Sequence, residues 1–166
     1  MLLVFLLVQG VVAQTLGLIS NIRFPTIEFA MNPLAGQIRM GTNGAMTYPT
    51  GASGASTGIP GQVQITGTVG SAVSIRCRRS ATLLGPSGAT LAINPAAVSI
   101  GTGQTYSAAP KCNGLTTTVI THTLTSNASQ NILYLAGQLQ SNGVTLVNGS
   151  YSISTGNKIT VRVVYI

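Results

Sequence analysis

The sequence ends in Ile159-Thr160-Val161-Arg162-Val163-Val164-Tyr165-Ile166, and this stretch decides the fold. Successive side chains of a β-strand point to opposite faces, so the alternation of apolar and polar residues predicts a strand with one buried face. The buried face is expected to carry Ile159, Val161, Val163 and Tyr165, whereas Thr160 and Arg162 point the other way. Such a strand is suited to complete a sheet, and we expect its pairing to be central to function.

The rest of the chain also has the turn signals of a β-protein. Four Asn-Gly pairs mark turns, and prolines interrupt the chain at intervals, so no segment shows convincing helical periodicity. About ten apolar or alternating runs predict strands: residues 16–29, 61–67, 72–77, 90–93, 97–100, 115–124, 132–139, 144–147, 151–154 and 159–166. The glycine- and serine-rich patch 47–61 is predicted to be a surface loop.

Composition narrows the class of protein. Charged residues make up 5% of the chain and aromatic residues another 5%, while the mean hydropathy is +0.43. Disorder requires low hydrophobicity and high charge, so the chain is predicted to fold. We expect an all-β fold, a β-sandwich of the kind found in exported proteins.

The first residues predict export. Residues 1–12 are almost wholly apolar and lead to Ala13, after which we place signal-peptidase cleavage. The alternative is a membrane anchor, but the run is shorter than the ~18 residues that span a bilayer, so no membrane span is expected in the mature chain. We therefore divide the chain into a signal peptide (1–13), a candidate N-terminal donor strand (14–24) and one β-sandwich domain (25–166). The mature chain is expected to pass the inner membrane into the periplasm and then to reach the cell surface or the medium.

Two cysteines, Cys77 and Cys112, are predicted to form a disulfide, because a cysteine pair in an exported domain meets an oxidising compartment. They would close a loop of about 36 residues, worth roughly 4 kcal/mol in the chain-entropy account. Two buried thiols are the alternative. A metal site is not expected, since no CxxC pair or companion histidine is present.

The chain is poor in catalytic residues. Glu28 is its only acidic residue and His122 its only histidine, so neither a carboxylate pair nor a Ser/His/Asp set can form within one chain. We expect that the protein is not an enzyme and binds no cofactor. His122 is predicted to be a packed or edge residue, and Glu28 a solvated or arginine-paired carboxylate.

The net charge of +7 comes from eight cations set against one acid. Arg76, Arg78 and Arg79 are the only cluster, and Arg76 and Arg78 share an outward face if Ile75 and Cys77 point inward. The cluster is either a patch for polyanions or a solvated strand end. Specific nucleic-acid binding is not expected, because no helix motif or aromatic platform accompanies it.

Several segments, taken in order, resemble an exported bacterial domain family of poorly defined function. They are Phe24-Pro25-Thr26-Ile27, residues 63–75, Leu135-Ala136-Gly137-Gln138-Leu139, Asn148-Gly149-Ser150-Tyr151-Ser152 and the terminal Val161-Arg162-Val163-Val164-Tyr165. The ending is also similar to that of spore-coat-protein-U-type and other chaperone–usher pilins. The resemblance covers most of residues 20–166.

The resemblance implies assembly by strand complementation. Pilins of that type have an incomplete immunoglobulin-like sandwich, whose missing strand comes first from a periplasmic chaperone and then from the N-terminal extension of the next subunit. The resemblance therefore implies an immunoglobulin-like antiparallel β-sandwich that a strand from a neighbouring subunit could complete. The candidate donor is residues 14–24, in which Leu16, Leu18, Ile22 and Phe24 share one parity, and the candidate acceptor rim includes residues 159–166. We expect the donor segment to pair with a neighbouring subunit. The alternative is that residues 16–29 form the first strand of their own sandwich.

The function expected from these features is that of a structural subunit of a bacterial cell-surface filament, pilus- or fimbria-like, or of a coat. Its partners would be further copies of itself, with a periplasmic chaperone and an outer-membrane usher during assembly. The alternative is a monomeric secreted or surface binding module, an adhesin or glycan-binding domain, that uses loops 47–61 and 101–110.

Overall fold

The structure is a computed structural model that describes residues 14–30, 36–140, 145–153 and 159–166. Its regular elements are antiparallel strands and two 3₁₀ turns, η1 (Pro86–Gly88) and η2 (Ala128–Asn131), so the all-β prediction is confirmed. The expected signal peptide, residues 1–13, lies outside the described residues. No helix in the described part of the chain is long and apolar enough to cross a membrane.

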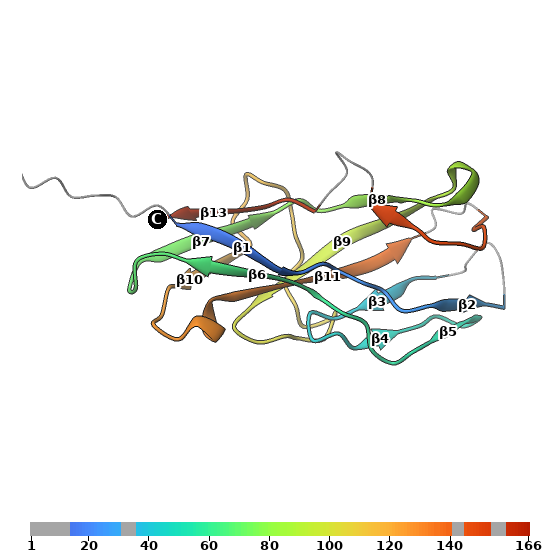
Figure 1. Ribbon diagram of the computed structural model, residues 1–166, viewed down its shortest axis with the longest axis horizontal. Helices are drawn as coiled ribbons and strands as arrows, with labels where there is room; N and C mark the ends of the chain where they lie inside the picture. Colours follow the sequence, from blue (N-terminus) through green and yellow to red (C-terminus); the bar gives the residue numbers. More distant parts are fainter. Residues whose placement is uncertain (1–13, 31–35, 141–144, 154–158) are drawn as a thin grey trace, which may run out of the picture.

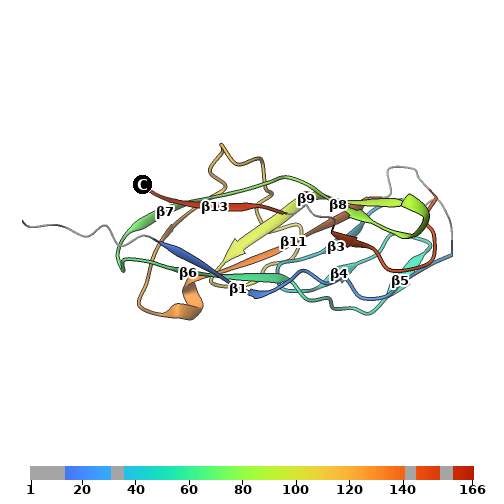
Figure 2. The ribbon, with the colours of Figure 1, turned by 45° about the horizontal axis from the view of Figure 1, so that its top comes forward.

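The largest sheet is antiparallel and curls into a half-barrel (Figures 1 and 2). Its strands follow the order β1 (Thr15–Ser20), β6 (Gly61–Thr66), β11 (Ile132–Gln140), β9 (Thr90–Ile100), β8 (Ala81–Leu84) and β12 (Ser152–Ile153). The long strand β11 pairs along the same chain with β3 (Ile38–Met40), which in turn pairs with β4 (Met46–Thr47).

Two smaller sheets complete the described structure. One has the order β10 (Ile120–Thr123), β7 (Ala72–Cys77) and β13 (Val161–Tyr165), so the terminal strand pairs with β7. The other pairs β2 (Ile27–Phe29) with β5 (Ala52–Gly54). The predicted terminal strand is therefore present, and it lies at an edge of its sheet.

Residues 110–114 join the half-barrel to the β10–β7–β13 sheet. The Cys112 amide donates to the Ala96 carbonyl on β9, and the Gly114 amide donates to the Cys77 carbonyl at the end of β7. The disulfide between Cys77 and Cys112 lies at the same crossing, with the two Cα atoms 5.1 Å apart, which confirms the predicted bond. Both cysteines are buried, so the bond is part of the core.

The core consists of aliphatic side chains from both of these sheets. On β7 the alternate residues Val73, Ile75 and Cys77 belong to the core. On the opposite face Arg76 is half-buried, and Ser74 is buried beside Thr118. The other large members come from distant parts of the chain, and they are Ile38, Ile65, Ile93, Val98, Leu124, Leu133, Leu135, Leu139 and Val163. The terminal strand β13 thus packs against the core with its apolar face, through Val163.

Several strand boundaries differ from the sequence-based expectation. Residues 16–29 split into β1 and β2, and Arg23 in the break bridges Ile59 instead. The runs 90–93 and 97–100, expected as two strands, form one strand, β9. Asn94 and Pro95 between them lie where the pairing with β11 shifts register. Proline lacks a backbone N–H, and at a register shift that hydrogen bond is not needed, so the strand continues through Pro95. Only residues 120–123 of the run 115–124 form a strand, and residues 145–147 form none.

Short strands were missed by the sequence pattern. β3 and β4 form a hairpin around Asn43-Gly44, where Gly44 has φ 83°, a conformation that favours glycine. β5 lies within the patch 47–61 that was expected to be only a loop, and β8 precedes β9. Each of these elements has two to four residues, too few for a period-two pattern to stand out.

Candidate assembly site at two strand edges

The first strand, β1, lies at the open edge of the half-barrel. It pairs with β6 in antiparallel register, which sets Leu16 opposite Ile65 and Leu18 opposite Val63. Residues directly opposite share a face of the sheet, and Ile65 is only 1% exposed, so Leu16 and Leu18 lie on the core side. Yet Leu16 is 44% exposed and Leu18 is 68% exposed. The core therefore stops short of β1 and leaves its apolar face uncovered.

The pairing of β1 within its own chain is the arrangement that the sequence left open as an alternative. Ile22 and Phe24, which share parity with Leu16 and Leu18, are half-buried against the core of the same chain. Pairing of residues 14–24 with a neighbour therefore stays a prediction. Such pairing would use the second edge of β1 because β6 occupies the first.

The terminal strand β13 lies at an edge of the second sheet. The Arg78 amide donates to the Thr160 carbonyl and the Ile166 amide donates to the Ala72 carbonyl, so even-numbered residues of β13 direct their backbone groups to β7. The backbone groups of Val161, Val163 and Tyr165 consequently point to the outer edge. Their side chains lie on the core side, as expected: Val163 is buried, and Ile159, Val161 and Tyr165 are half-buried against the core.

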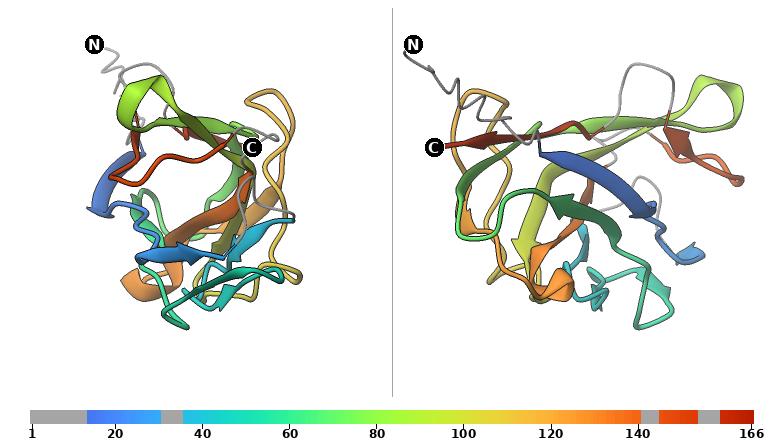
Figure 3. Two further views of the ribbon diagram at one scale, coloured as in Figure 1. Left: turned by 90° about the vertical axis from the view of Figure 1, so that its right-hand side faces the viewer. Right: turned by 60° about the vertical axis from the view of Figure 1, so that its left-hand side comes forward.

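One side chain partly covers this edge. The Gln14 side-chain amide donates a hydrogen bond to the Val163 carbonyl, which links the beginning of β1 to β13. Its Oε1 atom is buried and has no hydrogen-bond partner in the described part of the chain. From this contact the two strands diverge, as the ribbons show (Figures 1 and 3). Gln14 is thus a polar cap on the outer edge of β13 at Val163.

The penultimate Tyr165 anchors the end of β13. Its hydroxyl accepts a hydrogen bond of 3.1 Å from the Thr68 amide, in the turn between β6 and β7. The terminal strand is thereby fixed both to β7 through its backbone and to the end of β6 through this side chain. These two contacts hold the end of β13 in place.

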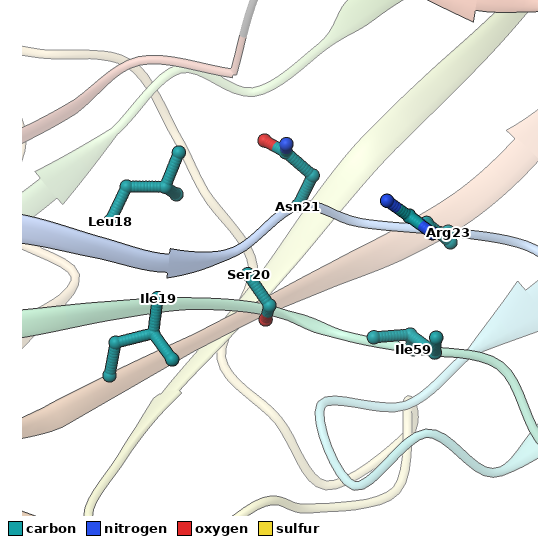
Figure 4. Close-up of a pocket in the computed structure, with 6 residues that line it drawn as sticks. All are labelled: Leu18, Ile19, Ser20, Asn21, Arg23 and Ile59. Atoms are coloured by element: carbon teal, nitrogen blue, oxygen red, sulfur yellow. The ribbon is translucent and has the colours of Figure 1, made fainter.

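A shallow pocket lies where β1 ends. It has a volume of about 290 Å³ and is lined by Leu18, Ile19, Ser20, Asn21, Arg23 and Ile59. Leu18 and Ile19 extend to opposite sides of the strand, as Figure 4 shows, and Ile19 and Ile59 are 54% and 49% exposed. Exposed apolar side chains therefore occupy both faces of β1 and continue onto the neighbouring segment.

The residues considered for catalysis are not brought together. Glu28 is exposed on β2, opposite Ser53, while His122 is half-buried and its Nε2 lies 3.0 Å from the Asn131 Oδ1. Within residues 14–30, 36–140, 145–153 and 159–166, no group of three or more His, Cys, Asp or Glu side chains could hold a metal. His122 has the environment of a packed residue.

A cationic cluster was missed by the sequence analysis. The Lys111 Nζ lies 4.4 Å from the ring centroid of Tyr106, and the Arg39 guanidinium carbon lies 5.5 Å from it. Burial raises the pKa of Tyr106, and burial together with the charge of Arg39 lowers the pKa of Lys111. Lys111 donates to the carbonyls of Tyr106 and Ala109, so it closes the loop 105–111 beside Cys112. Arg39 is distant in sequence, and no local pattern signals this contact.

Comparisons with known proteins found no match: no family model, no curated protein and no solved structure is similar to the chain.

Proposed function

We propose that this protein is a structural subunit of a bacterial surface filament or coat. In this proposal the second edge of β1 in one copy pairs with the outer edge of β13 in the next copy. The observation that carries it is the exposure of Leu16 and Leu18 on the core side of their sheet. A flat apolar edge strand is a template for pairing with another chain, and exposed apolar surface of this kind marks an interaction site.

The two edges are complementary. β1 offers Leu16 and Leu18, and β13 offers Val161, Val163 and Tyr165, each on the core side of its own sheet. Pairing them would continue the sheet across two copies and join the two apolar faces. Because the two edges differ, the contact is heterologous and can repeat without closing, which is what a filament requires.

This arrangement would make the half-barrel an immunoglobulin-like sandwich that a neighbour's strand completes. Export to the periplasm and cell surface, and assembly by a chaperone and usher, belong to the same proposal. The Gln14 cap on Val163 would have to open before the edges meet, so it would oppose pairing in the single chain.

The test is a charge placed on the β1 edge. Leu18→Lys should remain folded but fail to assemble, because a lysine on an edge strand opposes pairing. The matched control is Leu84→Lys, since Leu84 is another leucine on a strand and is 44% exposed. Sedimentation velocity and negative-stain microscopy would measure assembly, and circular dichroism would verify the fold. Filaments from Leu18→Lys, or loss of filaments in both variants, would contradict the proposal.

The alternative function is a monomeric secreted or surface binding module. The in-register pairing of β1 with its own β6 favours it, because the single chain then needs no neighbour to hold this strand. Loops 47–61 and 101–110 would contact the ligand, and the Tyr106–Arg39–Lys111 cluster lies at the second loop. A wild-type protein that stays monomeric at every concentration would support this alternative.

A further inference from the structure

Strand register places two arginines directly opposite one another. On the β7–β13 pair, Arg76 is the partner of Arg162, although the two lie far apart in sequence. Both point away from the core, because Ile75, Cys77 and Val163 beside them are buried. The exposed Arg78 and Arg79 follow at the end of β7. We call these four residues the arginine face.

The arginine face is electrostatically unfavourable by itself. Like charges directly opposite on a sheet repel and destabilise the pair. The only acidic side chain of the protein, Glu28, is on β2, which lies well away from β7 (Figure 1). No acidic side chain of the protein therefore neutralises Arg76 and Arg162, and an anion from outside the chain would relieve their repulsion.

The surroundings of Arg76 fit an oxyanion. Its Nε donates to the Ser74 Oγ at 3.3 Å, and the Ser74 Oγ lies 2.7 Å from the Thr118 Oγ1. These contacts fix the stem of the half-buried arginine. The two Nη groups can still form a bidentate pair with a sulfate or carboxylate, the geometry in which arginine binds most strongly.

We infer that the arginine face binds an acidic polysaccharide, a flexible chain of sugars that carry sulfate or carboxylate groups. The side chains placed at Arg76 are Arg162 opposite it, Ser74 and, hydrogen-bonded to Ser74, Thr118. None of them is an aromatic ring on which a base could stack, so a polysaccharide fits better than single-stranded nucleic acid. The inference does not depend on the filament proposal, because the face is complete within one chain.

The test compares Arg162→Gln with Arg23→Gln. Both remove one exposed arginine, and only Arg162 belongs to the arginine face. The probe is dextran sulfate, with uncharged dextran and single-stranded DNA of similar length as references, and binding is measured over a salt series. Arg162→Gln should weaken dextran sulfate binding about tenfold, as expected for loss of a charged hydrogen-bonded contact. It should also reduce the slope of log affinity against log salt by about 0.7 to 0.9.

A second readout separates a binding site from general charge. Because Arg162→Gln relieves the repulsion with Arg76, it should raise the melting temperature at low salt without dextran sulfate, whereas Arg23→Gln should not. The inference is overturned if the wild type binds dextran sulfate no better than uncharged dextran, if both variants lose equal affinity, or if DNA binds more tightly than dextran sulfate.

Discussion

Replacing Leu18 by alanine should separate assembly from folding. Full burial of a leucine side chain is worth about 1.5 to 3 kcal/mol. Leu18 is 68% exposed, so roughly a third of that value, about 0.5 to 1 kcal/mol, is realised in the single chain. The remaining 1 to 2 kcal/mol, roughly, is available when a neighbour covers the side chain. Leu18→Ala should therefore cost at most about 1 kcal/mol of the free energy of unfolding and weaken association about five- to thirtyfold.

The matched control is Leu133→Ala. Leu133 is 0% exposed, so its truncation should cost about 2 to 5 kcal/mol in stability while leaving the association of the folded fraction unchanged. Urea unfolding followed by circular dichroism measures the first quantity, and sedimentation velocity over a concentration series measures the second. If Leu18→Ala loses 3 kcal/mol or more (on the scale of a buried leucine), or associates as well as the wild type, the argument from exposure fails.

Three further changes test separate parts of the structure. The double variant Cys77→Ala, Cys112→Ala should lose about 4 kcal/mol in urea unfolding, because the bond closes a long loop, and a loss under about 1 kcal/mol would mean that the bond adds little. Gln14→Ala removes the hydrogen bond to the Val163 carbonyl, so it should lower the free energy of unfolding by about 0.5 to 1.5 kcal/mol. It should also tighten association, because the edge of β13 is then uncovered, and weaker association would show that Gln14 does not oppose pairing. The pKa of Tyr106 is raised by burial above the ordinary tyrosine value of 10.0, so the unfolded chain loses this proton first and stability falls as pH rises above 10.0. Tyr106→Phe should remove one late phenol ionisation from the absorbance titration and reduce that fall, and an unchanged titration would contradict the assigned burial.

The sequence could predict the faces of the longer strands. Alternation along 72–77 and 159–166 correctly placed Ile75, Cys77 and Val163 in the core and Arg162 outside, because it depends only on the period of a strand. The disulfide was predictable from the scarcity of cysteine and the expected compartment. These features need no knowledge of which strand pairs with which.

Features that depend on pairing could not be predicted. Register between β7 and β13 sets Arg76 opposite Arg162, and the hydrogen bonds of β13 decide which backbone groups point to its outer edge. Periodicity in one strand carries no information about its partner strand. The sequence therefore predicted a cluster of Arg76, Arg78 and Arg79, and only the fold adds Arg162 to it. The exposure of Leu18 likewise depends on where the core ends. The local sequence pattern does not carry that information.

The central claim is that β1 of one copy pairs with β13 of the next, and crosslinking between two differently labelled copies tests it most directly. One protein would carry Ile19→Cys on β1 and the other Thr160→Cys beside β13, both exposed positions, and a short bismaleimide would join thiols that lie close together. The matched control replaces Thr160→Cys by Thr123→Cys, an exposed site on β10 at the opposite edge of the same sheet. The account predicts an Ile19–Thr160 heterodimer and little Ile19–Thr123 product; equal yields from both mixtures, or no heterodimer in assembled protein, would contradict it.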